Sequence, residues 1–273
     1  MKRKFKQVDA FTDRPFRGNP VAVVLDGEGL DTAEMQHIAR WTNLSETTFL
    51  LPSQVADYRL RIFSPSHELP FAGHPTIGSA HAALEAGIAK GRKIKMECGA
   101  GVLDLTVDDG VIYVRSPAVK VSLAPDIPKE IGIALAPGAP LLRGEVGPVW
   151  LTGEIKDAAT LAGLKPDMTA LGNWSNAQRA TGVTVFAPSG EGDSAFHVRS
   201  FAPAHTIPED PVCGSGNICV AAYLRHLKTA PASYVARQGM QMGREGSVHM
   251  KVSSDAIEFG GRAVTSIEGS IAT

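Results

Sequence analysis

The chain alternates short apolar runs with polar turn residues along most of its length. Such runs, 3–6 residues long and rich in Val, Ile, Leu, Phe and Tyr, are typical of β-strands. Asp108-Asp109-Gly110 lies between two of them and predicts a tight hairpin. Strands at this frequency favour a barrel or sandwich over a parallel βαβ array. The predicted strands cover residues 21–25, 47–51, 58–63, 102–107, 111–115, 149–151, 183–186, 196–199, 234–236, 248–252 and 263–267.

Three segments have helical patterns. Asp31 is a suitable N-cap for a helix that ends at Thr42. The segments 74–88 and 215–225 are small or apolar on nearly every face. A helix without a polar face is enclosed by protein. Two sheets, each curled around one central helix, would accommodate both segments.

An internal repeat indicates a duplicated domain. Each of the two apolar helices follows an Arg-x-Phe-x-Pro pattern, and four matched pairs are each 138 positions apart, about half the chain. We expect one half over residues 1–118 and the other over residues 119–273, with the last strand able to return to the first half. The pairs are Arg61/Arg199, Phe63/Phe201, Pro65/Pro203 and Pro70/Pro208.

Composition excludes several classes of protein. The 273 residues have a net charge of −1, with 44% hydrophobic and 20% charged residues, which suits a folded core and not a nucleic-acid binder. No apolar run approaches the roughly 18 residues of a membrane helix, and no segment resembles a signal peptide. Dinucleotide, P-loop and serine-hydrolase motifs are absent. We expect a cytoplasmic, globular enzyme whose three cysteines, Cys98, Cys213 and Cys219, form neither a disulfide framework nor a zinc site.

Two glycine-containing loops precede the apolar helices. They are Ala72-Gly73-His74-Pro75 and Cys213-Gly214-Ser215-Gly216. A helix N-terminus favours an anion, and glycine allows a ligand to approach the backbone. If the two loops face each other across a cleft, they would bind one small carboxylate and stabilise enolate-like charge.

Glu46, His74 and Asp210 are the candidate residues for moving a proton. Each also has a plain structural interpretation. Glu46 suits a solvated strand end, His74 a helix cap, and Asp210 a turn before proline. Spacing alone does not choose between these interpretations.

Several motifs in order give a more specific indication. Together they resemble the PhzF phenazine-biosynthesis family, which has the diaminopimelate epimerase fold, from about residue 5 to the C-terminus. The resemblance implies an α+β protein of two pseudo-twofold-related domains, each a β-barrel-like sheet around a central helix, with the active site between them. It also implies a homodimer. The motifs are Val8-Asp-Ala-Phe-Thr-Asp13, Gly18-Asn-Pro-Val-Ala-Val23, Asn43-Leu-Ser-Glu-Thr-Thr-Phe49, Glu68-Leu-Pro-Phe-Ala-Gly-His-Pro-Thr76 and Glu209-Asp-Pro-Val-Cys-Gly-Ser215.

The resemblance implies roles for single residues. Glu46 takes the place of the family's acid/base glutamate, and His74, Asp210 and Ser215 match its histidine, aspartate and serine. Gly73 and Gly214 match the glycines whose amides line the substrate's carboxylate. Family members of known activity isomerise a dihydro-hydroxyanthranilate without a cofactor or metal. We therefore expect a small carboxylic acid as the substrate, and no nucleic-acid or membrane partner.

Cys213 departs from the family pattern. The Cys-Gly-Ser-Gly loop is similar to a catalytic-cysteine loop of diaminopimelate epimerases and proline racemases, which use one thiol from each half. The matching first-half position is Ala72, so a pair of thiols is absent. Two alternatives stay open: an epimerase, racemase or dehydratase that uses Cys213 alone, and a small-acid binding protein without catalysis.

Overall fold

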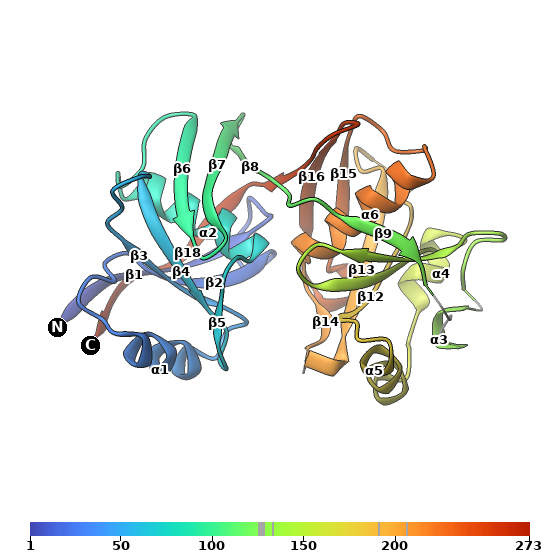
Figure 1. Cartoon of the computed structure of the whole chain (residues 1–273), viewed down its shortest axis with the longest axis horizontal. Helices are drawn as coiled ribbons and strands as arrows, with labels where there is room; N and C mark the ends of the chain where they lie inside the picture. Colours follow the sequence, from blue (N-terminus) through green and yellow to red (C-terminus); the bar gives the residue numbers. More distant parts are fainter. Residues whose placement is uncertain (125–128, 133, 191, 206) are drawn as a thin grey trace. The chain divides into compact units, whose positions relative to one another are not determined.

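The chain forms two compact units in a computed structural model that describes residues 1–124, 129–132, 134–190, 192–205 and 207–273 (Figure 1). Unit 1 comprises Met1–Arg115 and Gly260–Thr273, and unit 2 comprises Ser116–Phe259. The C-terminal segment thus joins the unit in which the chain begins. Among the described residues, no helix is long and apolar enough to cross a membrane.

Unit 1 is built on a sheet whose strands pair in the order β18-β1-β2-β3-β4-β6-β7-β8, with β5 beside β4. The pairs β2–β3 and β4–β6 are parallel and the others described are antiparallel. The strands are β1 (Lys2–Ala10), β2 (Asn19–Val24), β3 (Thr47–Leu51), β4 (Tyr58–Phe63), β5 (Glu68–Leu69), β6 (Lys93–Cys98), β7 (Gly101–Asp108), β8 (Val111–Arg115) and β18 (Ala263–Ala272).

Unit 2 repeats this topology. Its strands pair in the order β9-β10-β11-β12-β13-β15-β16, with β14 beside β13 and with β11–β12 and β13–β15 parallel. The two units therefore share one order of pairings, as the sequence repeat predicts. The strands are β9 (Lys120–Leu123), β10 (Leu141–Glu145), β11 (Val149–Glu154), β12 (Gly182–Pro188), β13 (Phe196–Ala202), β14 (Ile207–Asp210), β15 (Ser233–Gln238) and β16 (Gly246–Val252). Strand β17 (Ile257–Gly261) begins in unit 2 and ends in the segment assigned to unit 1.

Each sheet packs around one buried helix. In unit 1, α2 (Gly73–Glu85) contacts β1, β2, β3, β8 and β18. In unit 2, α6 (Gly214–His226) contacts β9, β10, β11, β12 and β16. Nine of the 13 residues of α2 and ten of the 13 residues of α6 are buried, which confirms the two enclosed helices expected from their composition. The remaining helices are α1 (Thr32–Thr42), α3 (Lys129–Gly132), α4 (Ala158–Gly163), α5 (Met168–Ala177), and the short 3₁₀ turns η1 (Pro203–His205) and η2 (Met240–Met242).

The structure revises one part of the repeat. Phe63 and Phe201 are equivalent, because Phe63 pairs with Thr47 at the start of β3 and Phe201 pairs with Val183 at the start of β12. From Glu68 and Glu209 onward, however, equivalent residues are 141 positions apart and no longer 138. The change occurs where unit 2 contains η1, a turn of three residues. The counterpart of Pro70 is therefore Pro211, and its match with Pro208 at the earlier spacing is wrong.

The central helices fit their sheets through small residues on opposite sides of the contact. A Cβ at Gly78 of α2 would lie 2.4 Å from Val21 and 3.6 Å from Val8, so the sheet fills the space. In α6 the equivalent residue is Cys219, and it packs on Gly144, where a Cβ would lie 2.7 Å from its sulfur. Close packing leaves room for only one side chain between helix and sheet at this position. In unit 1 the sheet supplies it, and in unit 2 the helix supplies it.

Candidate active site

Glu46 lies in the loop between α1 and β3, one residue before the strand. Helix α1 ends at Asn43, whose φ of 54° is the left-handed conformation that terminates many helices. The Glu46 carbonyl then accepts a hydrogen bond of 3.4 Å from the Ala22 N–H of β2. The backbone of Glu46 is thus held by the sheet.

The side chain of Glu46 contacts His74 on α2. Glu46 Oε2 and His74 Nε2 are 3.2 Å apart, and the two side chains are only 16% and 9% exposed. Burial raises the pKa of Glu46 from 4.5 to about 7, because the charged form loses its water, while a hydrogen bond from Ser45 lowers it. A carboxyl group with this pKa can both accept and return a proton near neutral pH.

The first turn of α2 places His74 beside this carboxylate. Gly73 begins the helix, and its N-cap Ala72 has no side-chain cap. A hydrogen bond of 2.8 Å between the Thr48 and Ser79 hydroxyls joins β3 to α2 inside the core. The elements that carry Glu46 and His74 are therefore locked together.

Unit 2 presents Asp210, Gly214 and Ser215 in one short segment. Asp210 ends β14, and its Oδ1 accepts a hydrogen bond of 3.0 Å from the Val212 N–H. Gly214 begins α6. Ser215 Oγ accepts a bond of 2.9 Å from the Trp150 indole N–H of β11. The sheet thus holds the serine side chain through this hydrogen bond.

Cys213 is the N-cap of α6 and is 4% exposed. Its sulfur accepts a hydrogen bond of 3.3 Å from the Gly216 N–H. Burial and the neighbouring Asp210 raise the pKa of the thiol well above 9.0. The thiol therefore stays protonated at neutral pH, which opposes its use as a thiolate base despite its place at a helix N-terminus.

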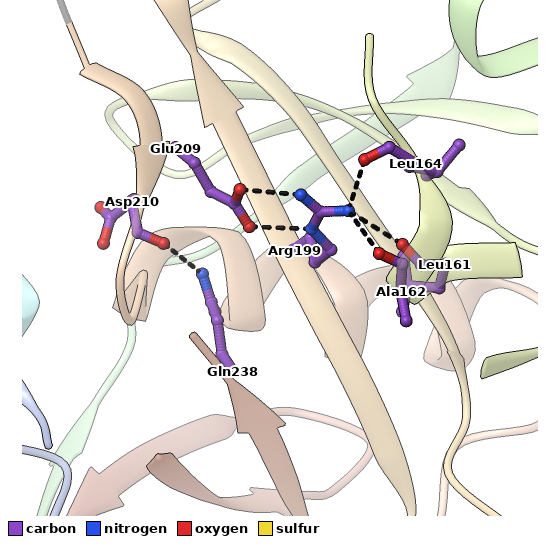
Figure 2. A network of polar contacts seen from close by, with 7 residues as sticks. All are labelled: Leu161, Ala162, Leu164, Arg199, Glu209, Asp210 and Gln238. Carbon is purple, nitrogen blue, oxygen red and sulfur yellow. Dashed lines mark hydrogen bonds and ion pairs between the residues drawn. The ribbon is translucent and has the colours of Figure 1, made fainter. Parts of the chain in front are cut away.

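In each unit an arginine pairs with a glutamate just before the central helix, and we call each such pair an arginine clamp. In unit 2, Arg199 Nε and Nη2 donate to both oxygens of Glu209 at 2.8 Å (Figure 2). Its Nη1 donates to the carbonyls of Leu161 and Leu164, and its guanidinium lies 4.8 Å from the Phe201 ring centroid. Bidentate pairs of this kind are strong and directional.

Unit 1 contains the same clamp in a more exposed form. Arg61 donates to both oxygens of Glu68 at 2.8 and 2.7 Å and lies 5.1 Å from the Phe63 ring centroid. The repeated Arg-x-Phe pattern thus has a structural role that its sequence did not reveal.

The structure brings Glu46 and His74 together in unit 1 and keeps Asp210, Gly214 and Ser215 in one loop of unit 2. It also shows groups that sequence reasoning missed: the side chains of Trp150, Asn217 and Gln238 make hydrogen bonds with the segment from Asp210 to Ser215. No sequence pattern marked these three residues. Among the side chains that hold this segment, only Arg199 had been noted in the sequence, as part of the repeat. In the described part of the chain, no cluster of His, Cys, Asp and Glu could hold a metal ion.

Comparison with known proteins decides the family. A sequence model described as "Phenazine biosynthesis-like protein" (PhzC-PhzF) matches residues 8–269. The chain belongs to the PhzC-PhzF family. The family resemblance stated from the motifs is therefore confirmed.

Relatives span the whole chain. "Antisense-enhancing sequence 1" of Schizosaccharomyces pombe is 40% identical, with 97% of each chain covered. The trans-2,3-dihydro-3-hydroxyanthranilate isomerase of Pseudomonas aeruginosa is 32% identical, covering 97% of this chain and 98% of the relative. A crystal structure of the Bacillus anthracis PhzF-family protein matches with a TM-score of 0.89 at 26% identity, over 100% of both chains.

These matches confirm the fold class and the type of protein. The PhzC-PhzF chain has the α+β, epimerase-like fold that was expected. Its relatives include several proteins named as isomerases, and the chain is an enzyme of this isomerase family.

Proposed function

We propose that this PhzC-PhzF chain is a cofactor-independent isomerase that moves a proton between carbon atoms of a small carboxylic acid. The observation that carries the proposal is the buried Glu46 carboxyl group, 3.2 Å from His74, with a pKa of about 7. In water a glutamate has a pKa of about 4.3 and is a weak base at neutral pH. Burial makes Glu46 a stronger base and, once protonated, a usable acid.

The reaction needs no external reactant. Glu46 takes a proton from a C–H bond of the substrate, and the electron pair of that bond moves into the adjacent π system. While it is protonated, Glu46 exchanges its proton with water, and it then delivers a proton to another carbon, where a new C–H bond forms. The substrate's double bond is displaced, and the enzyme returns to its starting state.

The other candidate residues bind and orient the substrate. Gly73 and Gly214 offer backbone N–H groups at helix starts, which suit a carboxylate and the negative charge that develops next to it. His74 orients Glu46 and, with Asp210 and Ser215, binds polar groups of the substrate. The relative of Pseudomonas aeruginosa suggests trans-2,3-dihydro-3-hydroxyanthranilate as a first substrate to test. A homodimer and a cytoplasmic location, both expected from the sequence, stay predictions.

Proton exchange in heavy water tests the proposal. The protein is incubated with trans-2,3-dihydro-3-hydroxyanthranilate in D₂O, and mass spectrometry follows both isomerisation and deuterium incorporation. The proposal expects both for the parent protein and neither for Glu46→Gln. Exchange that depends on Cys213 would support the one-cysteine epimerase, and tight binding without any exchange would support a binding protein.

The Cys213 alternative is weaker on the observations. The buried thiol beside Asp210 holds its proton at neutral pH, and its counterpart Ala72 has no ionisable group. A binding protein without catalysis is also less favoured, since the binding of a carboxylate alone gains nothing from a second, buried carboxyl group beside the site.

A further inference from the structure

Two buried side-chain amides join the ends of the loop that carries Asp210 and Gly214. Gln238 Nε2, at the end of β15, donates to the Asp210 carbonyl at 3.0 Å (Figure 2). Asn217 Nδ2, in the first turn of α6, donates to Gln238 Oε1 and to the Cys213 carbonyl, both at 2.9 Å. Neither Asn217 nor Gln238 has any exposed surface.

The direction of this chain of hydrogen bonds is determined by its ends. Both ends are backbone carbonyls, which only accept. Gln238 must therefore turn its NH₂ toward Asp210, which leaves its oxygen for Asn217. Asn217 must then turn its own NH₂ toward both Gln238 and Cys213. Each of these three hydrogen bonds thus has one defined donor and one defined acceptor.

The hydrogen bond from Asn217 to the Cys213 carbonyl is not needed to complete the helix. That carbonyl already accepts the ordinary helical bond from the Asn217 backbone N–H at 3.1 Å. The extra bond therefore acts on the peptide group itself. The carbonyl of Cys213 and the N–H of Gly214 belong to the same peptide, so withdrawing charge through the oxygen strengthens the opposite N–H as a donor.

Unit 1 makes the same extra bond with a different residue. Thr76 is equivalent to Asn217, and its hydroxyl donates to the Ala72 carbonyl at 2.8 Å. The Ala72 carbonyl also accepts the Thr76 backbone N–H, at 3.2 Å. The peptide thus held is the one that carries the Gly73 N–H. In both units, therefore, the carbonyl just before the helix accepts a second hydrogen bond from a side chain. In each case this carbonyl belongs to the peptide that carries the N–H of the helix's first glycine.

We propose that Asn217 is a positioning residue that orients and polarises the Gly214 N–H toward an anionic group of the substrate, with Gln238 holding Asn217 in place. This inference rests on the proposed function, in which the Gly214 N–H binds a carboxylate. It assigns a task to two residues that are fully buried. Thr76 performs the corresponding task for Gly73.

The chain permits a selective test of the Gly214 peptide. Cysteine is followed by glycine only at Cys98-Gly99 and Cys213-Gly214. Labelling with ¹³C-carbonyl cysteine and ¹⁵N-glycine therefore yields two signals in a spectrum that correlates carbonyl and amide, and Gly99 is the internal control. The variants are Asn217→Val, which lacks the donor, and Asn217→Thr, which has the side chain that unit 1 uses.

Valine and threonine have nearly the same shape, so any difference between the two variants reports on the threonine hydroxyl group. In Asn217→Val we expect the Cys213 carbonyl carbon to move upfield and the affinity for 3-hydroxyanthranilate, titrated on the Gly214 signal, to fall about tenfold. In Asn217→Thr both should return toward the parental values, with the Gly99 signal unmoved in all three proteins. An unchanged Gly214 signal and affinity in Asn217→Val would overturn the proposal, as would equal losses in the two variants.

A second variant keeps the test decisive if Asn217→Val does not fold. Gln238→Met removes the support for Asn217 and should move the Gly214 signal in the same direction by a smaller amount. No movement would contradict the role of Gln238 in holding Asn217 in place. Turnover is measured separately. A parent protein that fails to isomerise its substrate would refute the proposed function, while the Gly214 signal and the titration still decide the role of Asn217.

Discussion

Gly182 occupies in unit 2 the position that Glu46 occupies in unit 1. Each comes directly before the residue, Thr47 or Val183, that pairs with the equivalent phenylalanine of the next strand. A Cβ at Gly182 would lie 1.9 Å from the Phe201 carbonyl oxygen, so no side chain fits there. The duplicated fold therefore presents this buried carboxylate in one unit only, and the proposed proton transfer depends on Glu46 alone.

Replacing Glu46 with Gln should abolish turnover but preserve binding. Glutamine has almost the same shape and cannot accept a proton at neutral pH. General acid–base assistance is worth about 10²–10⁴-fold in rate, so kcat should fall by that factor while the affinity for a substrate analogue changes little. His74→Ala is the comparison, because it should weaken binding as well as turnover. Parental deuterium exchange in Glu46→Gln would make Asp210 the next candidate base.

The pH dependence of the rate should follow Glu46. As the base, Glu46 must be deprotonated, so kcat/KM should rise with pH and level off above its pKa of about 7. A pH profile from about 3.5 to 9 measures this, and Glu46→Gln should lose the rise. A profile whose rise lies near pH 4.5 would show that the carboxylate that carries the reaction is exposed to water.

The same pKa predicts how folding stability changes with pH. The folded pKa of Glu46 is raised from 4.5 to about 7, so the folded state binds more protons than the unfolded state between these values. The contribution of Glu46 to stability is thus complete below pH 4.5 and is lost as pH rises through 7. Relative to Glu46→Gln, the free energy of unfolding should decrease by about 2–3 kcal/mol from pH 5 to pH 8. Urea titrations of both proteins at the two pH values measure the difference.

Replacing Cys213 with Ser should preserve most of kcat/KM. The thiol is buried and protonated, and Ala72 offers no opposing group. Steady-state kinetics with folding checked by circular dichroism tests this. A loss of 10²-fold or more, typical for removal of an acid or base, would replace our mechanism with the one-cysteine epimerase.

The two arginine clamps should contribute differently to stability. In unit 2 the side chains of Arg199 and Glu209 are 6% and 12% exposed, whereas in unit 1 those of Arg61 and Glu68 are 16% and 38% exposed. Removing one partner of a buried pair leaves an uncompensated charge, at a cost of about 3–5 kcal/mol. Exposed pairs contribute about 0–1 kcal/mol.

Urea unfolding of Arg199→Met and Arg61→Met tests this difference. Arg199→Met should lose several-fold more free energy of unfolding than Arg61→Met. In the double variant Arg199→Met/Glu209→Leu, much of the loss should be regained, because no buried charge is left unpaired. Equal losses in the two single variants would show that burial of the clamp does not determine its contribution.

Local sequence patterns predicted most elements because the rules that specify them act over few residues. Asp31 caps α1 as expected, and the structure adds a capping box with Glu34. Asp109 and Gly110, both with positive φ, make the turn between β7 and β8. The small, apolar composition of α2 and α6 indicated burial on every side. These predictions needed no knowledge of distant neighbours.

The first strand escaped prediction because tertiary contacts neutralise its charges. Five of the nine residues of β1 are charged, a composition typical of a solvated segment. In the structure, Arg3 is 5% exposed and donates to the carbonyls of Asp26 and Glu28, and Lys6, also 5% exposed, pairs with Glu85 at 2.7 Å. These partners are 23 to 79 positions away, so no local pattern contains them.

The sequence by itself determined the strand-rich composition, the duplication, the two helix-start loops and the identity of the candidate residues, since motifs and spacing are properties of the chain. The protonation state of those residues, in contrast, depends on how the chain folds. The fold removes water from Glu46, which raises the pKa of its carboxyl group to about 7, and it places His74 3.2 Å away. Cys213 keeps its proton because the same kind of burial outweighs the helix N-terminus. Desolvation depends on what packs around a group from elsewhere in the chain, and a motif does not record it.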